Sequence, residues 1–92
     1  MGKGDILQIL GRSHALEILR ALNKKPMRFV DLKKVCESNR TRSARLKELE
    51  EKGLIRTVPK MIGRRAYTFY EITPLGKEVL TLCEKLLKLE LK

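Results

Sequence analysis

Cysteine and histidine are scarce in this sequence of 92 residues, which contains only Cys36, Cys83 and His14. The two cysteines form no CxxC pair, so the chain has too few ligands for a zinc site and too few thiols for a disulfide framework. We expect both cysteines to be small buried apolar residues, with a redox role as the alternative. His14 has no carboxylate or cysteine pattern around it, which indicates a histidine at the edge of the core. We therefore expect no metal and no cofactor.

Catalytic motifs and long hydrophobic runs are also missing. The sequence offers no Gly-rich phosphate loop, no Ser/His/Asp arrangement and no paired-carboxylate site, so we do not expect an enzyme. It contains no run of about 18 apolar residues, and its first ten residues, MGKGDILQIL, are too short and too polar for a signal peptide. These absences predict a cytoplasmic protein that does not associate with a membrane.

Acidic residues are few compared with basic ones. Eleven Asp and Glu stand against 21 Lys and Arg, which gives a net charge of +10 and favours a polyanionic partner. Uncharged amides are few, whereas Lys and Glu are plentiful, a composition typical of thermophile proteins. The length and the 42% hydrophobic content predict one globular domain over residues 1–92.

Helical spacing of apolar residues covers the first half of the chain. Residues 5–22 are expected to form a helix that Gly11 divides into a lead-in and a main part. Residues 28–36 predict a short second helix. A third helix, capped by Ser38 or Asn39, is expected to carry inward leucines and to stop at Gly53.

The second half changes from helical to alternating patterns. Residues 54–58 and 66–72 predict two strands, with Gly63 in the turn between them, and residues 74–91 predict a last helix that begins after a Thr-Pro start. The expected fold is mainly α with a small β-hairpin (α+β), in the order α-α-α-β-β-α, with room for a short extra strand between helices one and two. This order is that of a winged helix-turn-helix.

The phrases ILRAL, PMRFVDLKK, RLKELEEKGLI and YEITPLGKEVL follow one another across residues 14–85. In this order they resemble the HxlR group of winged-helix transcriptional regulators, with the MarR and ArsR groups as relatives. The resemblance implies binding to double-stranded DNA through the third helix and the hairpin, or wing. The chain departs from its relatives in carrying Arg42 where they tend to be apolar, and in a shorter wing. It also lacks the metal-binding cysteines of the ArsR group and the length of a MarR ligand pocket, so a small-molecule effector stays unknown.

The third helix predicts a reading surface at its N-terminal end, because a recognition helix enters the major groove by that end. Residues 39–65 contain nine Lys and Arg and three Glu, a net charge of +6. A solvated helix face and a solvated turn are the simpler alternatives. Arg42 projects toward the core side, from which its long side chain could extend to the DNA backbone. The candidate DNA contacts are Asn39, Arg40, Thr41, Arg42, Ser43, Ala44 and Lys47 on the helix, and Lys60, Arg64 and Arg65 on the wing.

Two apolar stripes run along the last helix, and one is enough to pack it on a small domain. We expect the stripe of Leu75, Val79, Leu82, Leu86 and Leu89 to face the domain and the second stripe to face another copy. A monomer with a broad core is the alternative. The predicted homodimer interface consists of Ile6, Leu7, Ile9, Leu10, Leu80, Cys83 and Leu87.

A two-fold dimer would present two recognition helices to an inverted repeat. The sequence therefore predicts a sequence-specific transcriptional regulator. Two alternatives stay open, a winged-helix module that binds protein or RNA and a sequence-neutral architectural protein on DNA.

Overall fold

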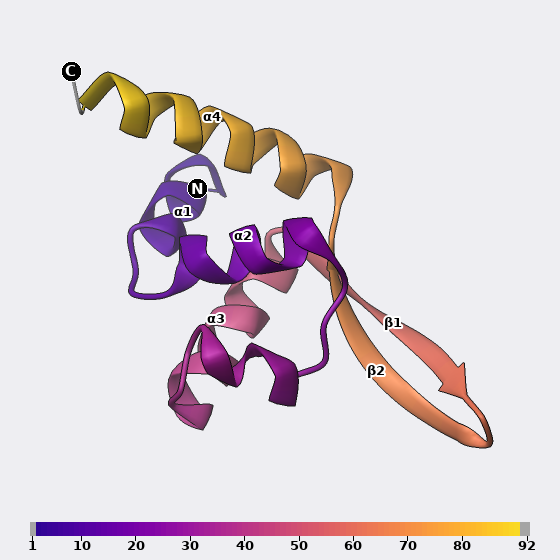
Figure 1. Ribbon diagram of the computed structural model, residues 1–92. Coiled ribbons are helices and arrows are strands. Elements are labelled where there is room, and N and C mark those ends of the chain that lie inside the picture. Colours follow the sequence, from indigo (N-terminus) through magenta and orange to yellow (C-terminus); the bar gives the residue numbers. More distant parts are fainter. Residues whose placement is uncertain (1, 91–92) are drawn as a thin grey trace.

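The structure, a computed structural model, describes residues 2–90 of the chain and the side chains from residue 6 onward. Figure 1 shows four α-helices, one short 3₁₀ segment and one β-hairpin. The predicted winged-helix order and the mainly α fold class are confirmed. The predicted end of the last helix at residue 91 lies outside the described residues. The elements are α1 (Gly2–Leu10), α2 (Ala15–Lys24), η1 (Val30–Lys34), α3 (Asn39–Glu51), β1 (Ile55–Ile62), β2 (Arg65–Ile72) and α4 (Pro74–Glu90).

The predicted first helix is divided into α1 and α2, as the position of Gly11 indicated. The Gly11 amide donates to the Leu7 carbonyl at 3.0 Å, the last such bond of α1. His14 then adopts a left-handed conformation with φ of 70°, which turns the chain into α2. A left-handed backbone is uncommon outside glycine, although histidine is among the residues enriched there. The break makes α1 and α2 two separately packed helices.

The predicted second helix is much shorter than residues 28–36. Only the five residues of η1 form a helix, and they do so in the tighter 3₁₀ geometry. The Arg28 amide donates to the Asp31 carboxylate at 3.1 Å, so a side chain and not a backbone carbonyl receives this bond at the start of the segment. The extra strand is reduced to one antiparallel bridge, in which Met27 and Tyr70 exchange backbone hydrogen bonds of 3.0 and 2.7 Å.

The hairpin strands are longer than predicted. Pro59 was expected to stop the first strand, yet it lies inside β1 opposite Thr68. Proline is tolerated there because the sheet has only two strands, so each strand has an open edge. Gly63, with φ of 65°, begins the two-residue turn, which fits the requirement of tight hairpins for a positive φ. The wing is therefore a ribbon of two eight-residue strands.

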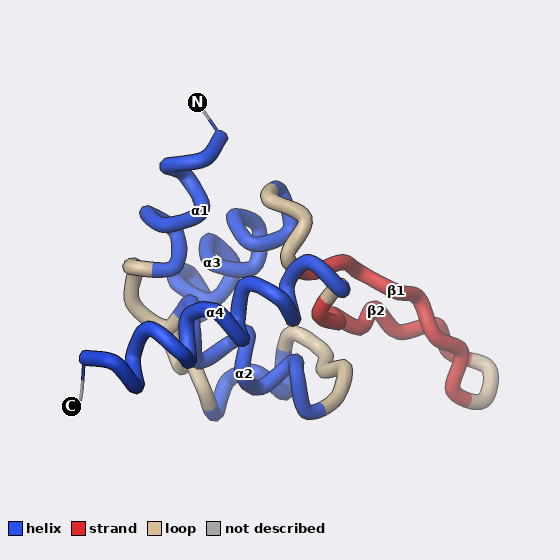
Figure 2. The backbone as a smooth tube through the Cα atoms, turned by 90° about the horizontal axis from the view of Figure 1, so that it is seen from above, coloured by secondary structure: helices blue, strands red, loops and turns tan. Residues whose placement is uncertain are grey.

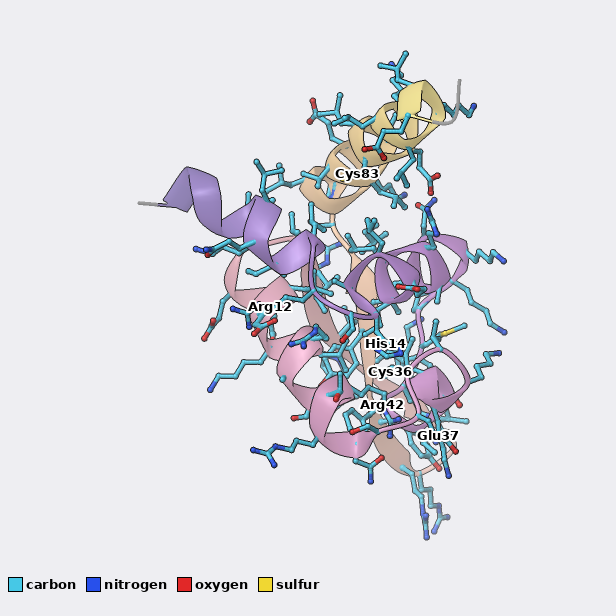
Figure 3. All side chains as sticks on the ribbon, turned by 90° about the vertical axis from the view of Figure 1, so that its left-hand side faces the viewer. Arg12, His14, Cys36, Glu37, Arg42 and Cys83 are labelled. Carbon is cyan, nitrogen blue, oxygen red and sulfur yellow. The ribbon has the colours of Figure 1, made fainter. Side chains whose placement is uncertain are left out.

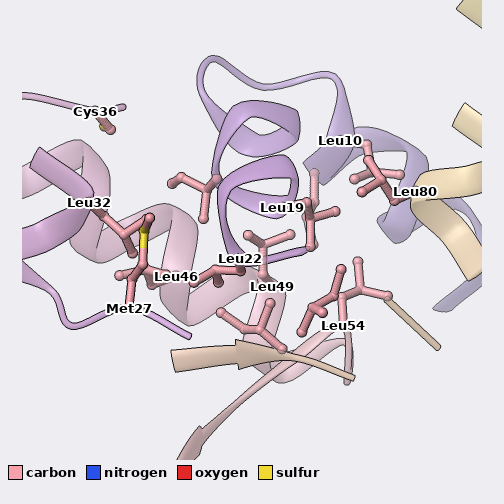
Figure 4. Close-up of a cluster of buried hydrophobic side chains, with 14 residues drawn as sticks. Leu10, Leu19, Leu22, Met27, Leu32, Cys36, Leu46, Leu49, Leu54 and Leu80 are labelled. Carbon is pink, nitrogen blue, oxygen red and sulfur yellow. The ribbon is translucent and has the colours of Figure 1, made fainter. Parts of the chain in front are cut away.

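The core surrounds α2, which lies between α3 on one side and α4 on the other (Figure 1). Figure 4 shows leucines from every helix meeting in one cluster. Leu46 and Leu49 of α3, predicted to face inward, are buried there. Gly76 lets α4 approach the chain closely, because a Cβ at that position would lie 2.1 Å from the Leu54 carbonyl oxygen.

The two ends of the molecule differ in their elements. Figure 1 shows α4 along one side, with the N-terminal half of α3, η1 and the wing tip toward the opposite side, and Figure 2 shows α4 from that outer side. Within residues 2–90, no helix has both the length and the apolar character needed to cross a membrane.

Candidate nucleic-acid interface

The N-terminus of α3 is built by a hydroxyl cap. The Ser38 hydroxyl accepts a hydrogen bond from the Thr41 amide at 3.2 Å, which satisfies one of the free N–H groups at the helix start. With Leu46 and Leu49 buried, the opposite side of the helix faces solvent. We use the term reading face for the N-terminal part of this side together with Asn39, the first residue of the helix. Its members, all exposed except the half-buried Thr41, are Asn39, Arg40, Thr41, Ser43, Ala44 and Lys47.

Arg42 is absent from the reading face, although the sequence placed it among the DNA contacts. Its side chain is 2% exposed, and its guanidinium turns inward, donating to the carbonyls of Cys36 at 2.6 Å and Glu37 at 3.3 Å. It also donates to the Asn39 side-chain oxygen and lies 4.2 Å from the centre of the Phe29 ring. Figure 3 shows Arg42 beside Cys36 and Glu37. The side chain cannot extend to a DNA backbone because these partners hold it inside.

The second turn of α3 is fastened to the turn between α1 and α2. Arg45 donates to the Ser13 carbonyl at 2.9 Å and to the Glu48 carboxylate at 3.1 Å. Glu48 also pairs with Arg12 at 2.6 Å. Sequence reasoning missed Arg12, because no local pattern connects it to Glu48, which lies 36 residues later in the chain.

The wing tip carries exposed cations. Arg64 and Arg65 lie in and beside the turn and are exposed to solvent. Lys60 is also exposed, and its ammonium lies 5.1 Å from the centre of the Phe69 ring. Such cation–π contacts orient a cation without removing it from solvent.

The aromatic residues of β2 are half-buried. Arg28 lies 5.2 Å from the centre of the Tyr67 ring. Tyr70 packs against the core, where burial raises the pKa of its hydroxyl and the Glu50 carboxylate adds to the shift. Packing on the core accounts for the place of Tyr70, and contacts with cations account for those of Tyr67 and Phe69.

On α4, the stripe predicted to face a second copy packs on the core, and most of the stripe predicted to face the core is exposed. Leu80 is buried in the core together with Ile9 and Leu10, so these three predicted interface residues were wrongly assigned (Figure 4). One turn later, Glu84 accepts a hydrogen bond from Arg20 of α2 at 2.8 Å, so the same side of α4 meets α2 there as well.

Four of the five residues of the stripe expected inside are exposed to solvent, whereas Val79 is half-buried against the core. We call these four exposed residues, with Leu7 of α1, the leucine face, and its members are 46–71% exposed: Leu7, Leu75, Leu82, Leu86 and Leu89. Of the remaining predicted interface residues, Ile6, Cys83 and Leu87 are half-buried. Burial raises the pKa of the Cys83 thiol, and the nearby Glu84 adds to the shift. A raised pKa disfavours the reactive thiolate.

An apolar groove of about 280 Å³ lies between α1 and α4. Its lining consists only of apolar side chains and Cys83. The groove continues the leucine face, since Leu7, Leu82 and Leu86 belong to both. The molecule therefore has a basic polar end at α3 and the wing and an apolar surface at α1 and α4.

Comparison with known proteins connects this arrangement with gene regulation. The family model described as HxlR-like helix-turn-helix matches residues 9–91. The transcriptional regulator homologue from Pyrococcus horikoshii OT3 is 28% identical, with a TM-score of 0.78 over 91% of this chain and 85% of that chain. The transcriptional regulator BldR from Sulfolobus solfataricus is also 28% identical, with a TM-score of 0.74 over 97% of this chain and 70% of that chain.

One further structure shares the fold alone. The reduced form of the transcriptional regulator YodB from B. subtilis is 20% identical, with a TM-score of 0.80 over 90% of this chain and 82% of that chain. Among curated proteins, none matches this chain.

Proposed function

The chain belongs to the HxlR-like helix-turn-helix family, and we propose that it acts as a homodimer on an inverted repeat in double-stranded DNA. It is a transcriptional regulator of the HxlR/MarR type, a kind of protein that binds DNA and is not an enzyme. The dimer, the operator symmetry and the contact residues are the parts that we add.

The observation that carries the proposal is the common direction of two basic elements. The N-terminal half of α3 and the wing tip point toward the same side of the molecule, away from α4 (Figure 1). The exposed cations that we assign to DNA contacts on these two elements are Arg40, Lys47, Lys60, Arg64 and Arg65. A helix N-terminus beside a basic ribbon fits a major groove flanked by a minor groove.

The reading face has the chemistry of base recognition. Arg40 can pair bidentately with guanine O6 and N7, while Ala44 and the Thr41 methyl can approach a thymine methyl. Ser43 and Lys47 supply donors for phosphate oxygens. On the wing, Arg64 and Arg65 suit a minor groove and Lys60 suits the adjacent backbone, contacts that would make binding sensitive to salt.

The leucine face supports the dimer. Single exposed leucines are ordinary on a protein surface, but a continuous apolar row beside an apolar groove is typical of an interface. A two-fold axis at this face would bury the leucines of both copies and leave the two reading faces outside. Half-sites about one helical turn apart would then receive them.

Selection of bound duplexes from a random DNA pool tests the proposal. We expect enrichment of an inverted repeat, and a loss of affinity of about 100-fold when Arg40→Ala and Lys47→Ala are combined. The matched control combines Lys77→Ala and Lys88→Ala, which removes the same charge from exposed positions of α4.

Each other outcome decides against the proposal in a distinct way. Equal affinity for random and enriched duplexes would identify a sequence-neutral architectural protein. Absence of duplex binding at low salt by the folded protein would leave the protein- or RNA-binding module. An equal loss in both double variants would mean that net charge, and not the reading face, sets the affinity.

A further inference from the structure

We propose that Arg42 is a positioning residue that holds Asn39 as a pure hydrogen-bond donor toward DNA. The first residue of the recognition helix then contacts an acceptor atom and does not form the two-bond pairing with adenine N6 and N7. This inference rests on the proposed function, since it concerns how the reading face selects its target.

Arg42 is the one charged side chain classified as buried within residues 6–90. Burial of a guanidinium is costly unless its N–H groups find acceptors. Two come from the turn before α3, where the carbonyls of Cys36 and Glu37 accept at 2.6 and 3.3 Å. The Asn39 side-chain oxygen is a third acceptor. Among the described residues, the buried Nε of Arg42 has no hydrogen-bond acceptor. Because the buried charge is short of acceptors, it should retain the Asn39 oxygen firmly.

The direction of the Asn39 amide follows from the chemistry of arginine. A guanidinium has five N–H donors and no acceptor, so only the oxygen of an amide can face it. Arg42 therefore fixes the orientation of the amide, with Oδ1 inward and Nδ2 available outward. Asn39 itself is exposed at the start of α3, so the free Nδ2 group is open to a ligand.

A fixed amide has a narrower choice of partners than a free one. A free asparagine recognises adenine with both atoms, accepting from N6 and donating to N7. With Oδ1 turned inward to Arg42, only Nδ2 faces outward, so Asn39 meets DNA as a donor and the two-bond pairing with adenine is lost. Its partner is then a DNA acceptor, either a base atom such as guanine O6, a purine N7 or thymine O4, or a phosphate oxygen.

Phe29 and the turn make the arrangement rigid. The Phe29 ring covers one side of the guanidinium at 4.2 Å, and the turn carbonyls belong to the segment that joins η1 to α3. Arg42 thus connects the two helical elements of the helix-turn-helix with the residue that faces DNA first. An apolar residue at position 42 would fill the same space without directing Asn39.

A double-mutant cycle on DNA affinity tests the coupling. Asn39→Ala should weaken binding to the selected duplex about tenfold in the natural background and less than about threefold in Arg42→Met, where the amide rotates freely. Methionine preserves length and apolar packing against Phe29. Equal losses in both backgrounds would overturn the proposal.

The same double-mutant cycle, repeated on a set of duplexes that each differ at one base pair, shows whether Asn39 donates to a base atom or to a phosphate oxygen. A loss confined to one base pair identifies a base edge, and Arg42→Met should then relax the discrimination against adenine there. A uniform loss across all duplexes identifies a phosphate. Tighter binding to adenine in the natural background than in Arg42→Met would contradict the fixed donor.

A titration keeps the test independent of DNA and of the Arg42→Met variant. In Asn39→Asp the new carboxyl would take the place of the amide oxygen beside the guanidinium. Its pKa, followed by NMR, should lie well below the ordinary value of about 3.9. An ordinary pKa would show that Arg42 does not hold this position. If the wild-type protein bound no duplex, the proposed function would be refuted. The titration would still show whether Arg42 contacts the side chain at position 39.

Discussion

Helices α3 and α4 each have one buried side, but their outer sides differ in kind. The outer side of α3 carries Arg40, Ser43 and Lys47, whereas that of α4 carries Leu82, Leu86 and Leu89. A polar outer side is stable in water and available to a charged partner, while an apolar one gains free energy when it is covered. The difference supports the proposal that the two helices bind different partners, DNA at α3 and a second copy of the chain at α4.

The largest expected effect comes from making the outer side of α4 resemble that of α3. Leu82→Gln with Leu86→Gln removes four leucines from the dimer, at a cost to association of roughly 6 kcal/mol. We expect a monomer in analytical ultracentrifugation and a marked loss of affinity for the inverted repeat, with little change in affinity for a single half-site. Thr81→Gln with Lys88→Gln is the control at exposed positions on another side of α4. Dimers that persist in the leucine variant would refute the interface.

This helix also shows where the sequence was insufficient. For α3, one apolar direction defined by Leu46 and Leu49 was enough to predict the buried side correctly. For α4, two stripes had equal apolar character, and periodicity does not say which one faces the domain. The choice depends on tertiary partners such as Arg20, which binds Glu84 from a helix 64 residues earlier in the chain. Leu80 was therefore assigned to the wrong surface.

The candidate site shows the same limit on a smaller scale. The residue types and the helix position predicted Arg40, Ser43 and Lys47 on an exposed side, and they are exposed. Arg42 had the right charge for DNA, yet its direction is decided by the carbonyls of the preceding turn and by Phe29. Local patterns locate a helix face, but the partners of a buried charge come from the fold.

The next largest effect tests whether α3 and α4 depend on the same packing contact. Gly76 lies at the start of α4, and a Cβ there would meet the carbonyl of Leu54, in the short segment between α3 and β1. Gly76→Ala should lower the free energy of unfolding by about 3 kcal/mol, because backbone must move to admit the methyl group. Thermal unfolding measures the loss, and DNA binding and dimerisation should fall together.

Gly11→Ala is the matched control, since its Cβ would lie 3.4 Å from the nearest atom, the Leu7 carbonyl oxygen. We expect a change within about 1 kcal/mol for this variant. A stable Gly76→Ala protein would show that α4 can shift without disturbing the segment after α3.

A smaller effect distinguishes the contribution of the wing to DNA binding from that of α3. Arg64→Ala with Arg65→Ala should lower DNA affinity about tenfold, uniformly across sequences, and reduce the slope of log affinity against log salt by about 2. Anisotropy titrations over a range of salt concentrations measure both quantities. The dimer should be unaffected, because the wing tip lies far from the leucine face (Figure 1). An unchanged salt slope would mean that the wing does not contact phosphates.

The smallest effect compares the hydroxyl caps that begin the two helices. Ser38 accepts one bond from the start of α3, whereas the Thr73 hydroxyl accepts from the Gly76 amide at 3.0 Å and donates to the Gly53 carbonyl at 2.6 Å. Ser38→Ala should cost about 1 kcal/mol of stability, and Thr73→Ala somewhat more. If α3 is the reading helix, Ser38→Ala should have the larger effect on DNA affinity, although it has the smaller effect on stability. Ser38→Ala frays the end that enters the groove, so it should weaken binding by the folded protein more than the costlier Thr73→Ala does.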